Sequence, residues 1–178
     1  MKRWTCAGDF NDRMLKEFMK FYNECENEGV LEAAIYIDSY GGEVHTADSI
    51  ISIMENSTIK FHTCVIGRAY SAGLLLAAAG QKRWATNRAE FMFHDISSEV
   101  EGKAREMREY VELTEKESKR VLGFFAKKTK KVLNWWISQT KKKESKDFYF
   151  NDKQALRYGV IDKIGIPEKK KKKEKKHK

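Results

Sequence analysis

The first third of the chain shows two patterns of apolar and polar positions, a helical period and a nearly continuous apolar run. Residues 12–22 carry apolar side chains at the three- and four-residue spacing of one helix face, namely Met14, Leu15, Phe18, Met19 and Tyr22. Residues 31–39, "LEAAIYIDS", form a short and nearly continuous apolar run, which predicts a strand buried on both faces. After the turn "YGGEV", helical spacing returns from Ala47 to Met54. This stretch therefore predicts a helix, a buried strand and a second helix.

The same order of elements continues along the next part of the chain. "FHTCVIG" at 61–67 predicts a second buried strand, and "YSAGLLLAAA" at 70–79 predicts a helix that leaves it. "KRWA" at 82–85 and "AEFMFHDI" at 89–96 predict two more strands. Strands that alternate with helices are typical of parallel sheets joined by crossover helices, so the expected fold class is α/β with a parallel sheet core.

A different pattern covers residues 98–131. Smaller or apolar residues recur there at alternating steps of three and four, with charged residues between them: Ala104, Met107, Val111, Thr114, Ser118, Val121 and Phe125. This pattern predicts one long amphipathic helix with a narrow seam. The seam is suited to packing against its own domain or against another subunit, and the pattern alone does not choose between them.

The last predicted element is a short helix within "FNDKQALRYG" at 150–159. Asn151 can cap its first turn, Gln154 can reach back to the cap, and Gly159 can end the helix. A chain of 178 residues fits one domain, which we expect to span residues 1–166.

Positive charge is concentrated at the end of the chain. Residues 168–178, "EKKKKKEKKHK", hold eight Lys and two Glu, and so account for +6 of the net charge of +9. Such a run repels itself and cannot bury surface, so we expect a disordered Lys-rich tail over 167–178. Two interpretations stay open, a solubilising tail or contact with nucleic acid, although no aromatic residue interleaves the lysines for base stacking.

The remaining composition excludes several classes of protein. Cys6, Cys25 and Cys64 are odd in number and lack the close pairing of zinc or redox motifs, so we expect buried or reduced thiols. No apolar run reaches the roughly 18 residues of a membrane span, and no secretory leader is visible. We therefore expect a cytoplasmic protein with no membrane partner.

Ser71 is the first candidate for chemistry, because it lies between a predicted strand end and a predicted helix, among small residues. It is either a serine that starts a helix or an exposed nucleophile. A nucleophilic serine needs a base and hydrogen-bond donors for the oxyanion. The N–H of Ala72 at the helix start can supply one donor. Gly41 and Gly42, at the neighbouring strand end, leave the backbone open for a second.

The base can be chosen from only four histidines. His177 lies in the tail, and His62 lies at the start of a strand. His45 follows the glycine pair and stays possible. His94 ends the strand "AEFMFH", at the sheet edge where the other strand ends gather, so this position favours His94 as the base.

Four blocks together carry a family resemblance: "IDSYGGEV", "GRAYSAGLLLAAAG", "FMFH" and "ALRYGVIDKI". The order and spacing of these blocks resemble those of the proteolytic subunit of the Clp protease, and the resemblance extends from about Trp4 to Ile164. The resemblance implies the ClpP/crotonase fold, with a long handle helix, and a Ser-His-Asp serine endopeptidase without cofactor or metal. It implies Ser71 as nucleophile, His94 as base, and the N–H groups of Gly42 and Ala72 as oxyanion donors.

The resemblance also implies the acid of the triad. Counting back from the closing helix to the family's aspartate reaches Asp147. Asp95 follows His94 directly, but adjacent side chains on a strand point to opposite faces. Asp152 is expected in the first turn of the closing helix.

Assembly and partners follow from the same resemblance. It implies polypeptide substrates and a homo-oligomer, a heptameric ring or stacked rings, in which the long helices interleave subunits. Two departures stand out: Tyr40 replaces the family's common proline, and "DIS" after His94 lacks one. Because the first strand is predicted almost directly after Met1, we expect no counterpart of the family's N-terminal axial loops, which makes partnership with an ATP-driven unfoldase doubtful. In this respect the chain resembles shortened Clp-like proteases of phages and prophages, some of which act in capsid maturation.

Three other functions are compatible with the sequence. A Ser-Lys enzyme related to signal peptide peptidases could use Lys82 or Lys103 as the base. A catalytically silent, capsid-associated scaffold could hold nucleic acid through the tail, although Ser71, His94, Asp147 and Gly42 are all intact. A crotonase-type acyl-CoA enzyme shares the fold but needs no serine triad, and it ranks last.

Overall fold

The computed structural model describes residues 1–96, 101–141 and 147–167. Its strands are β1 (Lys2–Phe10), β2 (Glu32–Gly42), β3 (Lys60–Tyr70), β4 (Arg83–Ala85), β5 (Glu90–Phe93), β6 (Phe148–Asn151) and β7 (Lys163–Ile164). Its helices are α1 (Asp12–Asn27), α2 (Val44–Asn56), α3 (Ala72–Ala79), α4 (Ala104–Lys128), α5 (Leu133–Thr140) and α6 (Asp152–Tyr158).

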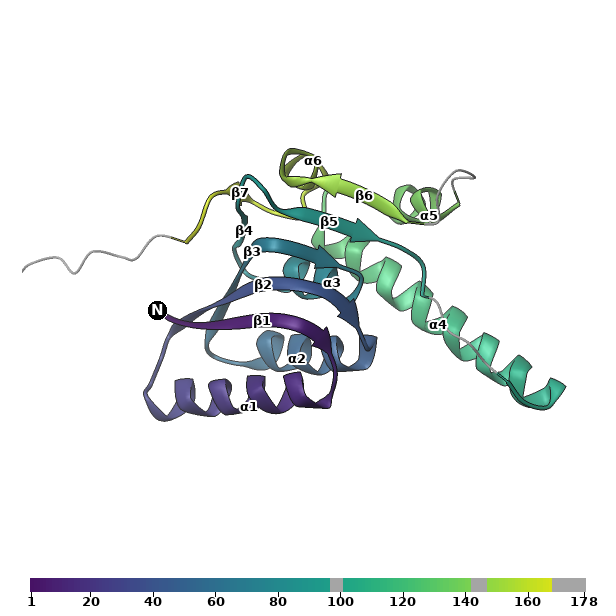
Figure 1. The fold of residues 1–178 in the computed structure, drawn as a ribbon, viewed down its shortest axis with the longest axis horizontal. Coiled ribbons are helices and arrows are strands. Elements are labelled where there is room, and N and C mark those ends of the chain that lie inside the picture. Colours follow the sequence, from purple (N-terminus) through teal and green to yellow (C-terminus); the bar gives the residue numbers. More distant parts are fainter. Residues whose placement is uncertain (97–100, 142–146, 168–178) are drawn as a thin grey trace, which may run out of the picture.

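The strands form one sheet with the order β1-β2-β3-β4-β7, in which neighbouring strands are parallel. The second half of β3 pairs with β5, also in parallel, and β6 pairs with β5 in the antiparallel direction. Figure 1 shows β1, β2 and β3 side by side, with β5 and β6 continuing the sheet. The expected α/β class with a parallel core is confirmed.

The hydrophobic core lies between the sheet and helices α1, α2 and α3 (Figure 1). Every residue of α3 is buried, and the aromatic ring of Phe18 in α1 packs against Trp4 and Phe61 of the sheet. Alternate residues of β2, such as Ile35 and Ile37, are fully buried on this side. Since α3 is surrounded by core, its first residue is held firmly at the sheet edge.

Several sequence predictions agree with these elements. The two early helices, the two long strands and the helix after Ser71 are all present. β3 is buried on both faces from Phe61 to Val65, as predicted, but β2 is not, because Tyr36 and Asp38 on its second face are only half-buried. In the closing helix, Asn151 Oδ1 accepts from the Gln154 N–H and Gln154 Oε1 accepts from the Asn151 N–H, both at 3.0 Å, while Gly159 takes the left-handed conformation. Cys6, Cys25 and Cys64 are free and buried, as expected.

The long helix was predicted over 98–131, and the structure corrects this to Ala104–Lys128. Its start is set by Glu106, whose carboxylate accepts the Lys103 N–H at 3.1 Å. Its end is set by Thr129, whose Oγ1 donates to the Phe125 carbonyl and accepts from the indole of Trp136. Residues 98–100, the start of the predicted span, lie outside the described residues.

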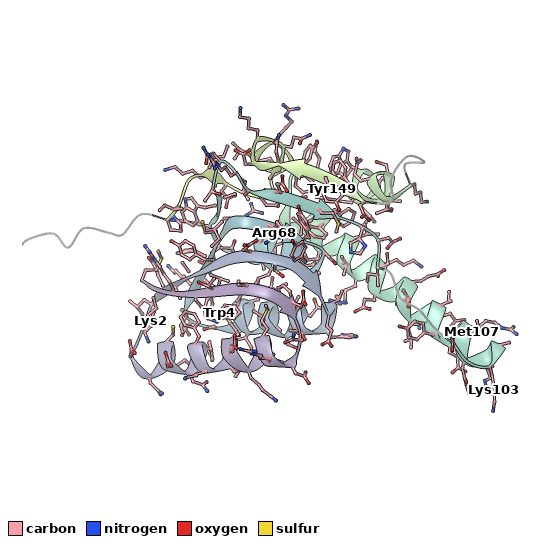
Figure 2. All side chains as sticks on the ribbon, viewed as in Figure 1. Lys2, Trp4, Arg68, Lys103, Met107 and Tyr149 are labelled. Carbon is pink, nitrogen blue, oxygen red and sulfur yellow. The ribbon has the colours of Figure 1, made fainter. Side chains whose placement is uncertain are left out.

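Helix α4 is buried at only one of its ends. Val121 and Phe125, near its C-terminal end, are buried in the core, whereas Met107 and Val111 are exposed. Figure 2 shows Lys103 and Met107 at the far end of a helix that extends well beyond the sheet. The predicted seam therefore has two parts, one inside the domain and one open to another partner.

Helix α5 and strands β6 and β7 were not predicted from the sequence. The run "LNWWISQT" of α5 buries Trp136 against Phe93 and Phe125, and this aromatic contact rather than a helical period defines its place. Within the described ranges no helix is both long and apolar enough to cross a membrane. The predicted tail lies, from residue 168 onward, outside the described residues.

Candidate active site

Ser71 lies in the turn between β3 and α3, with backbone angles φ 52° and ψ −118°. Among the described residues it is the only one other than glycine with positive φ. Its side chain forms no capping hydrogen bond with α3. A strained backbone angle of this kind costs on the order of 1–3 kcal/mol and persists where the surrounding structure demands it. Because the Ser71 hydroxyl forms no hydrogen bond with α3, it is available to other partners.

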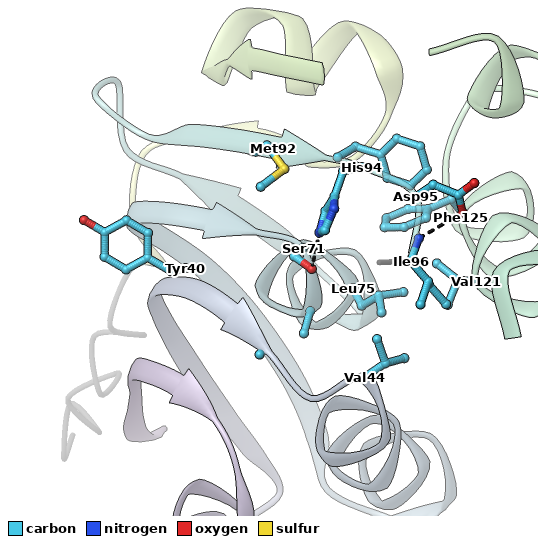
Figure 3. Close-up of a pocket in the computed structure, with 13 residues that line it drawn as sticks. Tyr40, Val44, Ser71, Leu75, Met92, His94, Asp95, Ile96, Val121 and Phe125 are labelled. Carbon is cyan, nitrogen blue, oxygen red and sulfur yellow. Dashed lines mark hydrogen bonds between the residues drawn. The ribbon is translucent and has the colours of Figure 1, made fainter. Parts of the chain in front are cut away.

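His94 follows the last residue of β5 and reaches Ser71 across the sheet edge. β3 and β5 pair in parallel up to Tyr70 and Met92, and the Ser71 N–H donates to the Met92 carbonyl at 3.0 Å. His94 Nε2 lies 2.8 Å from Ser71 Oγ, within hydrogen-bond distance (Figure 3). Both side chains are half-buried. A serine hydroxyl that hydrogen-bonds to an imidazole is the pairing that activates a serine nucleophile.

The glycine pair ends β2 directly beside Ser71. A Cβ added to Gly41 would lie 2.7 Å from the Cβ of Ser71, and Gly41 has φ 108°, so only glycine allows this approach. The Gly41 N–H donates to Ser39 Oγ at 3.0 Å, so it already has a partner. Gly42 lines the cavity at Ser71 together with Ala72. Of the pair, Gly42 is thus the residue that lies at the cavity wall.

Asp147 lies immediately before β6, and it is half-buried. The antiparallel ladder between β5 and β6 runs from Glu90 opposite Asn151 to Phe93 opposite Phe148. Continued by one residue, the same register sets His94 opposite Asp147. Directly opposite residues of such a pair have Cβ atoms about 5 Å apart and side chains on the same face.

The other candidate acids and bases lie elsewhere. Asp95 Oδ1 accepts from the Ile96 N–H and from the hydroxyl of Ser118 on α4. Asp152 is in the first turn of α6, as predicted. His45 is exposed on α2, 3.6 Å from a carboxylate oxygen of Glu117. The structure therefore brings His94, and not His45, to Ser71.

Neither lysine considered as an alternative base lies near Ser71. The Lys82 carbonyl accepts from the Thr63 N–H near the start of β3, and eight residues of strand, roughly 25 Å, separate Thr63 from Ser71. Lys103 precedes α4, and the helix residue Val121 that reaches the cavity is roughly 27 Å further along the axis. The geometry does not support a Ser-Lys pair.

A cavity of about 370 Å³ opens next to the Ser71–His94 pair (Figure 3). Its apolar lining comes from Val44, Leu75, Met92, Ile96, Val121 and Phe125. Tyr40, the residue that replaces the proline expected before the glycine pair, lies at its rim and is exposed. Sequence reasoning did not identify this cavity, although it had noted Val121 and Phe125 as part of the long seam.

One group of three potential metal ligands exists among the described residues: His45, Asp48 and Glu117, with ligand atoms within 4.8 Å of one another. The guanidinium of Arg120 donates to both carboxylates, so a cation already occupies this position. None of these residues lines the cavity at Ser71.

The site thus consists of a serine–histidine pair at the strand ends of a parallel α/β sheet, beside a largely apolar cavity, and this is an arrangement typical of hydrolases. Residues 10–168 match the family model of the Clp protease. The match covers most of the 178 residues, and the chain belongs to the Clp protease family. Peptidase activity is the function class of this family.

Proposed function

We propose that this protein is a serine endopeptidase in which Ser71 is the nucleophile and His94 the general base. The observation that carries the proposal is the 2.8 Å distance between Ser71 Oγ and His94 Nε2. A general base must lie within hydrogen-bond distance of the hydroxyl whose proton it accepts, and His94 does. The cavity beside Ser71 leaves room for a peptide carbonyl.

The reaction would proceed in two halves. Ser71 Oγ attacks the carbonyl carbon of the scissile peptide bond while His94 Nε2 accepts the hydroxyl proton. The tetrahedral intermediate collapses, the C–N bond breaks, and His94 donates the proton to the leaving amine. Water then attacks the acyl-enzyme ester with His94 as base, which releases the acid product and restores Ser71.

Two backbone donors are suited to the oxyanion of this intermediate. The Ala72 N–H is at the first position of α3, where no partner within the helix exists and the helix dipole favours negative charge. The Gly42 N–H belongs to the β2 residue that lines the same cavity. Removal of one such donor costs about 3–4 kcal/mol in other hydrolases, so their alignment matters for the rate.

Asp147 is the acid that we assign to the triad. Its position opposite His94 in the continued β5–β6 register supports this role, and Asp95 is held by Ser118 instead. A carboxylate beside the imidazole would hold the tautomer with the proton on Nδ1, so that Nε2 is free to accept. It would also stabilise the imidazolium that forms during the reaction.

The apolar cavity is suited to an apolar side chain of the substrate. Leu75, Val121 and Phe125 surround it, and two of these belong to α4. We infer that the substrate side chain next to the scissile bond binds there. Because α4 forms one wall, the position of this helix would influence substrate binding.

We also propose that the protein acts as an oligomeric ring, joined through the free part of α4. Apolar side chains are exposed on that part of the helix, at Met107, Tyr110, Val111 and Leu113. Leu113 is 62% exposed, and a partner chain would remove this apolar surface from water. Polypeptides able to enter the ring would then be the substrates.

Assembly through α4 is testable by its effect on mass. Leu113→Glu introduces a charge into the exposed apolar surface and should lower the mass of the particle measured by light scattering after gel filtration. Lys119→Gln changes the net charge by the same amount on the same helix and should leave the mass unchanged. If wild type is a monomer, or if Leu113→Glu assembles fully, assembly through α4 is wrong.

Covalent labelling tests the proposed function directly. A peptidyl diaryl phosphonate should form an adduct on Ser71, found by mass spectrometry of the digested protein. Ser49→Ala, a change of an exposed serine whose hydroxyl bonds to the His45 carbonyl, should be labelled like wild type. A folded, assembled protein that gives no adduct on Ser71 contradicts the proposal.

A further inference from the structure

The pairing of β2 with β3 is interrupted just before the site. Ile37 pairs with Val65, but the next pair is Ser39 with Ala69. One residue of β2, Asp38, therefore faces three residues of β3, the range 66–68. A bulge of this kind bends the strand and removes backbone groups from the ladder.

The Asp38 carboxylate fills the gap that the bulge creates. Its Oδ1 accepts the backbone N–H of Arg68 at 3.0 Å. The carboxylate also lies flat against Gly67, where an added Cβ would be 2.6 Å from Oδ1. A side-chain oxygen thus takes the place of the main-chain acceptor that an unbroken ladder would offer to Arg68.

The bulge also lies where β3 changes its neighbour on the other edge. Up to Val65, β3 pairs with β4, and from Arg68 it pairs with β5. The second half of β3 ends at Ser71, and β5 leads to His94. The direction that β3 takes after the bulge therefore determines where the serine lies relative to both the histidine and the glycine pair.

We propose that Asp38 is a positioning residue for the nucleophile: its carboxylate holds the β3 bulge and so sets Ser71 at the correct distance from His94 and Gly42. The inference rests on the proposed function of Ser71. Beyond the bulge, β2 and β3 come so close that Gly41 tolerates no side chain against Ser71, so a small shift of β3 changes the site. Misplacement by about 1 Å can cost a hundredfold in rate.

Arg68 also forms an ion pair with the same carboxylate, and this is the competing explanation of Asp38. Its Nε lies 2.9 Å from Oδ1, and its guanidinium stacks on the ring of Tyr40 at 4.0 Å. The hydrogen bonds from Arg68 hold the pKa of the Asp38 carboxyl below its usual range. The carboxylate therefore stays charged at neutral pH, and the ion pair is lost only as the pH falls through that lowered pKa.

Two variants test separately the hydrogen-bond acceptor of Asp38 and its negative charge. Asp38→Asn retains an oxygen at the position of Oδ1 but loses the charge, whereas Asp38→Glu retains the charge but adds a methylene where Gly67 leaves no room. We expect kcat for peptide cleavage within about threefold of wild type in Asp38→Asn and reduced about 10- to 100-fold in Asp38→Glu, with KM changed less than twofold. Arg68→Ala retains its own backbone N–H and should behave like Asp38→Asn.

Amide hydrogen exchange at Arg68, measured on the same variants, gives a readout that does not depend on activity. Exchange should stay slow in Asp38→Asn and become at least tenfold faster in Asp38→Ala. If Asp38→Ala exchanges like wild type, Asp38 does not hold the bulge and the positioning role is wrong. If Asp38→Glu is as active as wild type while Asp38→Asn is not, the positioning role is also wrong and the ion pair with Arg68 is the explanation. Failure of wild type to form a phosphonate adduct would instead overturn the role of Ser71, and the exchange result would still show whether Asp38 holds the bulge.

Discussion

Replacing Ser71 with alanine should lower the rate of peptide cleavage by about 10⁶-fold, to the level at which only binding and oxyanion stabilisation act. The side chain of Ser71 forms no cap on α3, so its loss removes no hydrogen bond from the helix. We therefore expect the thermal unfolding temperature and the particle mass to stay at their wild-type values. Cleavage of a fluorogenic peptide and of an unfolded protein, both with saturating substrate, measures the effect.

The control for this experiment is Ser49→Ala, which should cleave like wild type. Activity of Ser71→Ala within tenfold of wild type would show either that another residue is the nucleophile or that a contaminating protease produces the signal. Phosphonate labelling separates these outcomes, because an adduct elsewhere on the chain identifies the other nucleophile. No adduct on the chain at all would point to the contaminant.

The central part of the fold could be predicted because it is built from local patterns. Runs such as 31–39 and 61–67 are rich in apolar residues and short enough for strands, and the helices between them have one apolar face. Two other elements, β7 and α5, could not be predicted in this way. β7 has two residues and depends on its pairing with β4, and α5 depends on the burial of Trp136.

The residues of the candidate site also differ in whether local sequence patterns could predict them. Ser71 and His94 could be predicted to meet because each lies at the end of a parallel strand, and the structure brings their side chains to 2.8 Å. Asp147 could be reached from the sequence only through the family resemblance. Its position depends on the antiparallel pairing of β6, which no local pattern revealed. The role of Asp38 could not be predicted for a similar reason. A bulge is defined by the pairing of two strands, and the sequence of one strand does not show it.

Replacing His94 with alanine should lower the rate of cleavage about as much as Ser71→Ala does, because the hydroxyl without its base is a poor nucleophile. The two effects should not add, so the double variant Ser71→Ala/His94→Ala should be no slower than either single variant. Asp147→Asn should cost less, about 10⁴-fold, because the imidazole remains and only its tautomer and its charged form lose support.

Lysine variants complete the test of the base. Lys82→Ala and Lys103→Ala should retain activity within about twofold. Lys82 pairs with Thr63, roughly 25 Å along β3 from Ser71, and Lys103 is roughly 27 Å along α4 from Val121 at the cavity. Activity that survives in His94→Ala and disappears in one of these lysine variants would assign the base to that lysine. Loss of activity in His94→Ala alone supports the serine–histidine pair, whereas activity retained in all three variants would contradict every one of these base assignments.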